Sequence, residues 1–193
     1  MIIGITGGTG CGKTTLLKEI EERGGLVLDC DAVYHELLTR DMALLNAIND
    51  RFPGVVVDQK LERKKLGAIV FADEQALQDL NAITHGAIKT EIVRRLAENH
   101  KLAAIDAIAL FEGGLAALCD TTVAITAPRD ARIQRLMKRD GISAQYAENR
   151  INAQKSEDWF RQMCEHTLHN DGTQAQFREK CSEFLDPRFS KSL

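Results

Sequence analysis

The sequence lacks several features that would point to particular classes of protein. No apolar run approaches the length of a membrane span, and no basic region precedes an apolar stretch at the N-terminus, so we expect neither a membrane protein nor a cleaved leader. The 25 lysines and arginines are outnumbered by 28 aspartates and glutamates, and the net charge of −3 argues against a dedicated nucleic-acid binder. The cysteines number five, an odd count without metal-type spacing, which favours free thiols in a reducing cytoplasm.

Internal repeats, low-complexity tracts and a linker between independent domains are also missing from the sequence. The 193 residues suit one domain of ordinary size, and 44% hydrophobic with 27% charged residues is typical of a soluble globular protein. We therefore predict a single domain over residues 1–193 that is a monomer or small homo-oligomer, with neither nucleic acid nor membrane as a partner.

The most informative motif in the sequence is a glycine-rich stretch near the N-terminus. Residues 7–14 read G-G-T-G-C-G-K-T, which fits the phosphate-binding pattern G-x-x-x-x-G-K-[ST]. Glycines allow backbone conformations in which successive N–H groups turn inward around an anion, and the following helix adds its positive end. Lys13 can place a charge on the β- and γ-phosphates of a nucleotide, and Thr14 can offer its hydroxyl to Mg²⁺.

The flanks of this stretch supply the context that the pattern needs. Residues 2–6 form a short apolar run rich in β-branched side chains, which suits a buried strand. Residues 15–23 carry apolar side chains on one helical face and end at Gly24 and Gly25. An ordinary glycine turn is the alternative, but the order of strand, loop and helix favours a nucleotide phosphate site.

Acidic residues stand where buried strands are predicted to end. Residues 26–29 and 102–106 read as strands; the first leads into Asp29 and Asp31, and the second ends in Asp106. Ligands bind at this edge of an open α/β sheet. Asp31 is a candidate catalytic carboxylate as well as a plausible N-cap for a helix over residues 32–38. Asp106 suits Mg²⁺ or its waters, and Glu112 follows in a loop near the same edge.

The segment from residue 42 to about residue 99 is nearly all helical in pattern, with an interruption around residues 52–54. The apolar spacing predicts one amphipathic helix around residues 61–71 and a longer one around residues 77–96, bent near Gly86. An all-helical insertion between strands is the usual position of an acceptor-binding subdomain. Arg63, Lys64, Lys65 and His85 could contact an anionic acceptor there, but a solvated helix face and a local structural role for the histidine are the alternatives.

Clustered arginines follow a strand predicted at residues 121–126. Arg132, Arg135 and Arg139 lie along one helix face, and a second helix from about Ala144 adds Arg150 and Gln154. Two short helices of this kind suit a lid that closes over a triphosphate, since arginine stabilises the transferring phosphoryl group and closure excludes water. A solvated basic helix is the alternative. A last strand at residues 167–170 ends in a polar loop that could meet an adenine ring, and a terminal helix follows at about residues 173–185.

Taken together, these motifs resemble the dephospho-CoA kinase family over nearly the whole chain. The residues that carry the resemblance include the loop at 6–15, the Asp29–Asp31 pair with His35, and the Arg63–Gly67 and Val70–Phe71 segments. Further along the chain they are residues 83–85, 110–112, 134–136, 139–141, 150–151 and 154, and finally 170–172. Each match alone is weak, but the order and spacing together are quite specific.

The resemblance implies a kinase that uses ATP and Mg²⁺ to phosphorylate the ribose 3′-hydroxyl of dephospho-CoA. It implies an α/β, three-layer P-loop fold with a mostly parallel five-stranded sheet, comprising a nucleotide-binding core at residues 1–38 and 100–193, a helical acceptor-binding insertion at 39–99 and a lid at 138–155. Asp31, Lys13 and Arg139 are the implied catalytic residues. The implied ATP contacts are Gly8, Thr9, Gly10, Cys11, Gly12, Lys13, Thr14, Thr15, Arg139 and Asn170. The implied acceptor contacts are Asp31, His35, Arg63, Lys64, His85 and Glu112, and the metal contacts are Thr14 and Asp106.

Cys11 stands where serine is common in the family loop. A thiol beside Lys13 and a helix N-terminus is expected to have a lowered pKa and to be open to oxidation or alkylation, whereas an inert substitute for serine is the other interpretation.

Two other functions compete with this interpretation. Another small-molecule P-loop kinase, acting on a nucleoside or nucleotide, would share the loop, the lid and the carboxylates at the sheet edge. A nucleotide-binding regulatory protein is the candidate from a different class; a GTPase-type switch would need an Asn-Lys-x-Asp element, and the sequence has none.

Overall fold

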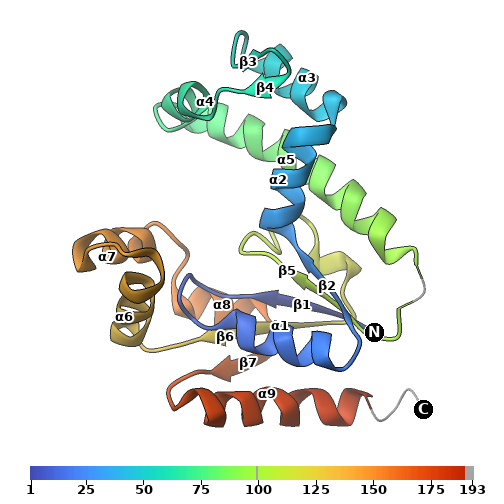
Figure 1. Cartoon of the computed structure of the whole chain (residues 1–193), viewed down its shortest axis with the longest axis vertical. Helices are drawn as coiled ribbons and strands as arrows, with labels where there is room; N and C mark the ends of the chain where they lie inside the picture. Colours follow the sequence, from blue (N-terminus) through green and yellow to red (C-terminus); the bar gives the residue numbers. More distant parts are fainter. Residues whose placement is uncertain (99, 190–193) are drawn as a thin grey trace. The chain divides into compact units, whose positions relative to one another are not determined.

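The computed structural model describes residues 1–98 and 100–189, and only the backbone of residues 187–189. It divides into two compact units (Figure 1). The sheet unit comprises Met1–Leu28, Asn99–Phe111 and Leu115–Leu193, and the helical unit comprises Asp29–Glu98 and Glu112–Gly114. Each unit has its own buried side chains and is described by itself below.

A five-stranded sheet forms the centre of the sheet unit, with the strand order β2-β5-β1-β6-β7. The strands are β1 (Ile2–Thr6), β2 (Leu26–Asp29), β5 (Ala103–Asp106), β6 (Thr121–Thr126) and β7 (His166–His169). β1 pairs in parallel with β5 and β6, and β6 pairs in parallel with β7. The parallel pairing brings the carboxyl ends of neighbouring strands to one edge, and confirms the predicted α/β fold.

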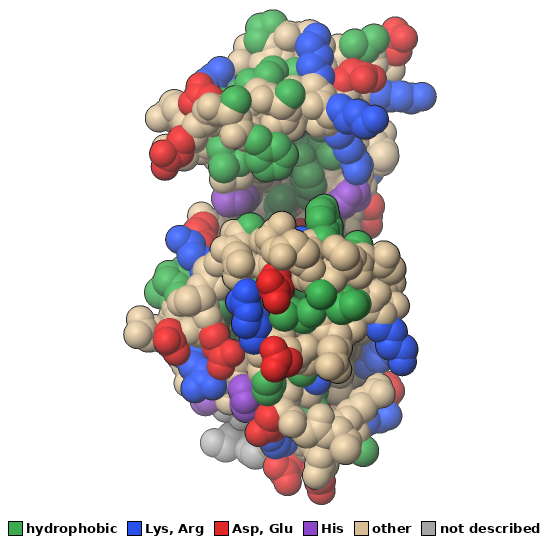
Figure 2. Space-filling view, turned by 90° about the vertical axis from the view of Figure 1, so that its left-hand side faces the viewer, with side chains coloured by type: hydrophobic (Ala, Val, Ile, Leu, Met, Phe, Trp, Pro, Cys, Tyr) green, Lys and Arg blue, Asp and Glu red, His purple; other side chains and the backbone are tan. Residues whose placement is uncertain are grey.

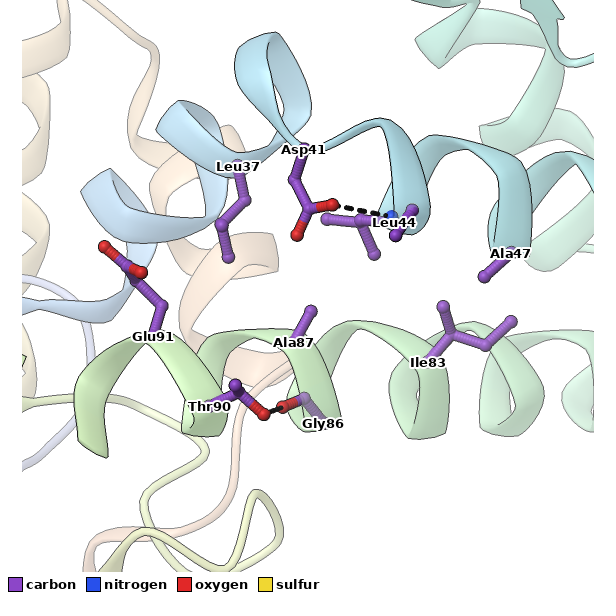
Figure 3. A pocket seen from close by; sticks show the side chains of 10 residues that line it. Leu37, Asp41, Leu44, Ala47, Ile83, Gly86, Ala87, Thr90 and Glu91 are labelled. Carbon is purple, nitrogen blue, oxygen red and sulfur yellow. Dashed lines mark hydrogen bonds between the residues drawn. The ribbon is translucent and has the colours of Figure 1, made fainter. Parts of the chain in front are cut away.

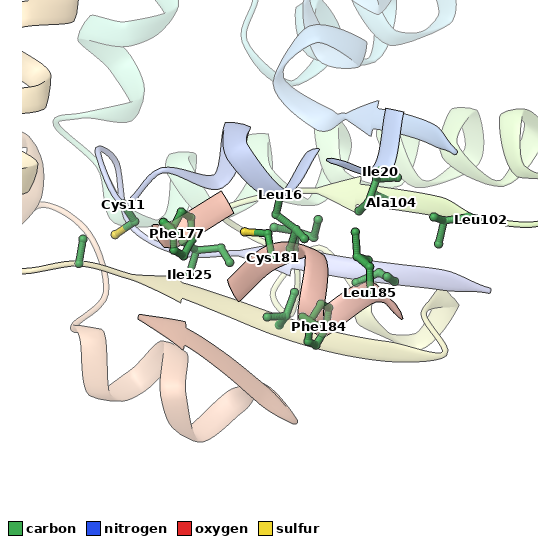
Figure 4. Packing of buried hydrophobic residues seen from close by; sticks show 14 residues of the cluster. Cys11, Leu16, Ile20, Leu102, Ala104, Ile125, Phe177, Cys181, Phe184 and Leu185 are labelled. Atoms are coloured by element: carbon green, nitrogen blue, oxygen red, sulfur yellow. The ribbon is translucent and has the colours of Figure 1, made fainter. Parts of the chain in front are cut away.

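Two helices cover one face of this sheet and bury its core (Figure 4). α1 (Lys13–Glu22) and α9 (Gln174–Phe189) pack against each other. Alternate strand residues such as Ile3 and Ile5 meet Leu16 of α1 and Phe177 of α9, and all four side chains are almost fully buried. α8 (Glu157–Met163), a helix that the sequence pattern did not predict, packs against β6. Gly4 has no room for a side chain because Leu110 and Cys119 lie directly over it.

The helices α6 (Arg129–Asp140) and α7 (Ala144–Asn152) complete the sheet unit, together with a short 3-10 helix at Ala116–Leu118. α6 and α7 pack on each other around Leu136, Ala147 and Ile151, which form a small hydrophobic cluster of their own. Ser143 caps α7 by accepting a hydrogen bond from the backbone N–H of Tyr146.

The helical unit is built around its longest helix, α5 (Glu74–Leu96). The helices α2 (Cys30–Arg40), α3 (Met42–Arg51) and α4 (Arg63–Val70) all pack against it. Asp41 caps α3 through the backbone N–H of Leu44, and Asp73 caps α5 through those of Gln75 and Ala76. These caps explain why the chain can turn sharply between successive helices.

This unit differs from the predicted insertion in two respects. It begins at Asp29 rather than at residue 39, because α2 packs on α3 and α5. It is also not all helical, since β3 (Val56–Val57) and β4 (Lys60–Leu61) pair antiparallel. Asp58 and Gln59 join them with φ angles of 49° and 61°, the geometry of a tight two-residue hairpin turn. The predicted helix around residue 61 therefore begins at Arg63.

The helical unit exposes several large apolar side chains, seen among the green atoms of Figure 2. Phe71, at the end of α4, is 86% exposed, and Val57 of the hairpin is 50% exposed. Among the described residues, no helix is long and apolar enough to cross a membrane.

Candidate active site

The loop between β1 and α1 has the backbone that a phosphate cradle needs. Gly7 and Gly12 have φ angles of 140° and 98°, values that residues with a Cβ rarely adopt. Gly12 is the N-cap of α1, so the positive end of that helix opens onto the loop. The ammonium of Lys13 donates to the backbone oxygen of Gly7 at 3.1 Å and lies 3.9 Å from Oδ1 of Asp106, at the end of β5.

Two side chains from outside the loop hold its backbone in place. Asn170, which follows β7, is buried and donates from Nδ2 to the oxygen of Cys11 at 2.9 Å. Arg135 of α6 donates to the oxygens of Gly10 and Cys11 at 3.2 and 3.4 Å, and to Oδ1 of Asn170 at 3.2 Å. Asn170, predicted as an ATP contact, thus uses its amide to bond to the loop and to Arg135.

A second pair of side chains contacts the other half of the loop. Arg132 donates from Nε to the oxygen of Thr9 at 2.9 Å, and the Thr9 N–H donates to Oε1 of Gln154 at 2.8 Å. Arg132 and Gln154 also line a pocket of about 360 Å³. The other lining residues are Ala127, Arg129, Ile151, Asn152, Lys155, Ser156 and Glu157. The space beside the loop is therefore bordered by several cations, which suits an anionic ligand.

Arg139, predicted as the catalytic arginine, is not among these loop contacts. Its guanidinium donates to both carboxylate oxygens of Asp140, at 2.7 and 3.0 Å, and Arg150 donates to the same carboxylate at 2.6 Å. These two arginines hold the pKa of Asp140 down at about 2. The helical spacing of the arginines was visible in the sequence, but which of them reach the loop depends on how α6 is placed against it.

The environment of Cys11 contradicts the predicted reactive thiol. Its side chain is only 3% exposed and packs in the core under the loop. Burial raises the pKa of the Cys11 thiol, and the nearby cations Arg132, Lys13 and Arg135 offset this only in part. The structure supports the other interpretation, an inert small residue.

The residues predicted for Mg²⁺ both lie in the sheet unit. Thr14 is an exposed residue in the first turn of α1, and Asp106 is the last residue of β5. Among residues 1–98 and 100–189, no group of three or more histidines, cysteines or acids could hold a metal. A hydroxyl and one carboxylate fit Mg²⁺ in the mode in which nucleotide phosphates and water supply its other ligands.

The residues predicted for the acceptor all lie in the helical unit. Asp29, not Asp31, caps α2, because its side chain accepts from the N–H groups of Asp31 and Ala32 at 2.9 and 3.1 Å. The exposed side chain of Asp31 in the first turn of α2 therefore has no capping role. One turn later, Nδ1 of His35 lies 2.7 Å from the backbone oxygen of Asp31.

The remaining acceptor candidates are spread over α4, α5 and the loop at Glu112–Gly114. Arg63 and Lys64 are exposed in the first turn of α4, whereas Lys65 donates to the backbone oxygen of Gly54 at 2.8 Å. His85 is half-buried on α5, and Lys89 one turn later lies against Gly114, two residues after the exposed Glu112. The structure thus places Glu112 on the segment that lies beside α5.

A separate groove of about 330 Å³ lies within the helical unit, between α5 and the corner where α2 meets α3 (Figure 3). Small side chains such as Ala47 and Ala87, with Gly86, leave this space open. The polar groups of Asp41 and Thr90 on its rim already bond to Leu44 and Gly86. His85 precedes Gly86 by one position and so lies on a different side of α5.

A glycine loop with its lysine at the carboxyl edge of a parallel sheet, backed by arginines and accompanied by a helical unit, defines a P-loop nucleoside-triphosphate enzyme. The family model "Dephospho-CoA kinase" matches residues 1–176. The chain belongs to the dephospho-CoA kinase family.

Individual relatives and solved structures resemble the chain over almost its whole length. A dephospho-CoA kinase from Anaeromyxobacter dehalogenans is 37% identical over 190 residues, covering 95% of this chain and 90% of the relative. The solved structure of TT1252 from Thermus thermophilus is 29% identical, with a TM-score of 0.83 and 97% of each chain covered. A dephospho-CoA kinase structure from Campylobacter jejuni shares the fold, with 24% identity, a TM-score of 0.70, and coverage of 100% of this chain and 98% of that one.

Proposed function

We propose that the chain catalyses the ATP-dependent phosphorylation of the ribose 3′-hydroxyl of dephospho-CoA, giving coenzyme A and ADP. The observation that carries the proposal is the built phosphate loop, with Lys13 near Asp106, in a chain that the family model matches over residues 1–176. Its candidate nucleotide residues all belong to the sheet unit and its candidate acceptor residues all belong to the helical unit. Such a division suits a reaction that joins two substrates.

The sheet unit would bind the triphosphate. The loop N–H groups and those at the N-terminus of α1 would donate hydrogen bonds to phosphate oxygens, and the ammonium of Lys13 would leave the Gly7 oxygen to contact the β- and γ-phosphates. Arg132 and Arg135 keep the loop in the required shape through its carbonyl oxygens. For Arg139 to meet the phosphates, as the family resemblance implies, its guanidinium would have to leave Asp140.

Thr14 and Asp106 would hold Mg²⁺ together with the nucleotide phosphates. When bound, Mg²⁺ would neutralise part of the charge on the β- and γ-phosphate oxygens. Lys13 near Asp106 keeps one of the two carboxylate oxygens close to the phosphate loop, in a position to serve this role.

The helical unit would bind dephospho-CoA and orient its hydroxyl. Asp31 is the best candidate for that task, because its side chain is exposed at the start of α2 and the N-terminus of this helix is capped by Asp29. A carboxylate that accepts the hydroxyl hydrogen positions the attacking oxygen, which is the main contribution a protein makes to phosphoryl transfer. Arg63, Lys64, His35, His85 and Glu112 would contact the rest of the acceptor.

A cytoplasmic location is part of the proposal. All of the cysteines are free thiols, and the pKa values of Cys119 and Cys164 are raised to about 12 and about 11 by burial, so neither is poised to form disulfides.

A panel of acceptors tests the proposed substrate. Purified protein with Mg²⁺ and ATP is given dephospho-CoA, adenosine, CMP or shikimate, and ADP release is followed. We expect turnover with dephospho-CoA alone. Turnover with another acceptor would keep the P-loop kinase and discard the substrate, while tight ATP binding without any turnover would favour a regulatory protein.

A further inference from the structure

One side chain from outside the phosphate loop accepts a hydrogen bond from a backbone N–H of that loop. The Oε1 atom of Gln154 accepts the Thr9 N–H at 2.8 Å and lies 3.4 Å from Nη2 of Arg132. Gln154 follows α7 by two positions, and α6 and α7 flank the loop between β1 and α1 (Figure 1). Gly8 makes this arrangement possible, because a Cβ there would overlap Nη2 of Arg132 and lie 3.2 Å from Oε1 of Gln154.

A backbone N–H and a guanidinium around one oxygen are the partners that bind phosphoryl oxygens in proteins. The carboxamide oxygen of Gln154 is neutral, so its bonds to these donors are weaker than those of a charged phosphate oxygen. The adjoining pocket of about 360 Å³, which Gln154 and Arg132 both line, gives an anion access to the same donors. A phosphate that reached them would replace Gln154.

We propose that Gln154 is a positioning residue: in the nucleotide-free loop, its side-chain oxygen bonds to the donors that a phosphoryl oxygen of the nucleotide would bind. It ties the segment after α7 to Thr9, keeps the N–H of Thr9 and the guanidinium of Arg132 in place, and is released when a nucleotide phosphate takes over these donors. Binding of nucleotide and release of this segment are therefore one coupled event. The proposal rests on the proposed binding of ATP to the loop.

Two substitutions of Gln154 with opposite expected effects on ATP affinity test whether phosphate displaces this side chain. In Gln154→Glu the acceptor is charged and holds Arg132 more strongly, so we expect ATP and tripolyphosphate to bind about tenfold more weakly or worse. In Gln154→Met no acceptor has to be displaced, so we expect both probes to bind about threefold more tightly. Gln145→Glu and Gln145→Met are the matched controls, because Gln145 lies exposed on α7 and bonds only to Asn149 among the described residues.

Calorimetric titration in the absence of acceptor measures these affinities, and thermal unfolding shows that each variant is folded. Weaker binding in both Gln154 variants would mean that Gln154 itself helps to hold phosphate, and unchanged binding in both would mean that it is not displaced; either result overturns the proposal. Because no acceptor is present, the outcome does not depend on dephospho-CoA. Absence of turnover with dephospho-CoA would overturn the proposed function alone.

The single tryptophan gives a second measurement. Trp159 lies on α8 close after Gln154, and the ammonium of Lys155 is 5.6 Å from the centre of its ring. We expect ATP to shift the emission of Trp159, and Gln154→Met to show part of that shift before nucleotide is added. Emission of the nucleotide-free Met variant identical to that of the nucleotide-free wild type would contradict release of the segment.

Discussion

Gly7 stands where β1 passes into the phosphate loop, and a side chain there has no room. A Cβ would overlap the backbone oxygen of Ile125 in β6, and the φ angle of 140° is itself unfavourable for other residues. Gly86 is the opposite case, because it lies inside α5 and a Cβ there meets no atom within 4 Å.

We expect Gly7→Ala to lower the free energy of unfolding by about 2 kcal/mol or more, through strain and overlap with the backbone of β6. Gly86→Ala is expected to raise it by about 0.5–1 kcal/mol, because alanine favours a helix over glycine. Denaturant unfolding of the two variants beside the wild type measures both. Equal changes in the free energy of unfolding for the two variants would contradict the strained backbone geometry described for Gly7.

Cys11 gives a second prediction at the scale of one residue. Because burial raises the pKa of its thiol, little thiolate forms at neutral pH, and we expect iodoacetamide to modify Cys11 slowly in the native protein and rapidly after unfolding. Mass spectrometry of the digested protein over time gives both rates. If Cys11 of the native protein were modified rapidly and ATP prevented this, the interpretation of Cys11 as a reactive thiol would be supported instead.

At the scale of the element, α6 is the helix that supports the phosphate loop. Arg135 reaches two loop carbonyls and Asn170, whereas Arg139, one turn further, pairs with Asp140 at the surface. We expect Arg135→Ala to weaken ATP binding by about tenfold or more and to lower the unfolding temperature.

The matched variant Arg139→Ala is expected to leave the unfolding temperature within about 1 °C, because an exposed ion pair contributes little to stability. If Arg139 acts on the transferring phosphate, kcat falls in this variant while the Kd for ATP is unchanged. Thermal unfolding, ATP titration and steady-state kinetics separate the two arginines. A larger loss of ATP affinity in Arg139→Ala than in Arg135→Ala would contradict the assigned roles.

α5 carries an ion cluster that links stability to pH. The guanidiniums of Arg94, Arg95 and Arg40 donate to Glu91, whose side chain is 9% exposed, and hold the pKa of its carboxyl well below the ordinary value. A depressed folded-state pKa stabilises the protein above the ordinary glutamate pKa of about 4.3, and this stabilisation is lost as pH falls toward the folded-state value.

We therefore expect the unfolding temperature to fall on acidification below about pH 4, and to fall less steeply in Glu91→Gln, which starts lower at neutral pH by about 3 °C or more. Asp79→Asn is the comparison: hydrogen bonds from Gln75 and Arg51 also lower the pKa of its carboxyl, but this ion pair is open to solvent, so we expect a smaller change in the acid slope. Thermal unfolding across the acid range compares the variants. Parallel curves for the wild type and Glu91→Gln would contradict this assignment.

The elements differed in how far their sequences predicted them. The strands and the loop at residues 7–14 follow from β-branched runs and glycine spacing, both of which act locally, and they are confirmed. The hairpin around Asp58 and Gln59 was missed, because its strands are too short to show alternation and its turn lacks the usual glycine. α8 was also missed, because its 7 residues are too few to show a helical repeat of apolar side chains.

The candidate site shows the same limit. The type and spacing of its residues predicted the phosphate site, but the contacts of Arg132, Arg135 and Gln154 with the loop depend on tertiary packing over more than a hundred positions of sequence. The sequence favoured Asp31 as the cap of α2, and this was wrong, because the extended backbone of Asp29 lets its side chain accept from the first N–H groups of the helix.

At the scale of the whole molecule, we propose that the two units bind different substrates of the reaction. The residues proposed for ATP lie on the sheet unit, and Asp31 with the other residues proposed for the acceptor lies on the helical unit. This division predicts that changes in one unit affect one substrate: Lys13 variants should lose ATP binding, and Asp31 variants should keep it.

The central claim is transfer of the γ-phosphoryl group of ATP to the ribose 3′-hydroxyl of dephospho-CoA. Phosphorus NMR of the product made by the wild type and by Asp31→Asn, with ATP binding measured in parallel, tests it most directly. We predict a new 3′-phosphate monoester with the wild type, and a loss of about a hundredfold or more in rate with unchanged ATP affinity in the variant. A phosphate at another position, or full activity of Asp31→Asn, would contradict the account.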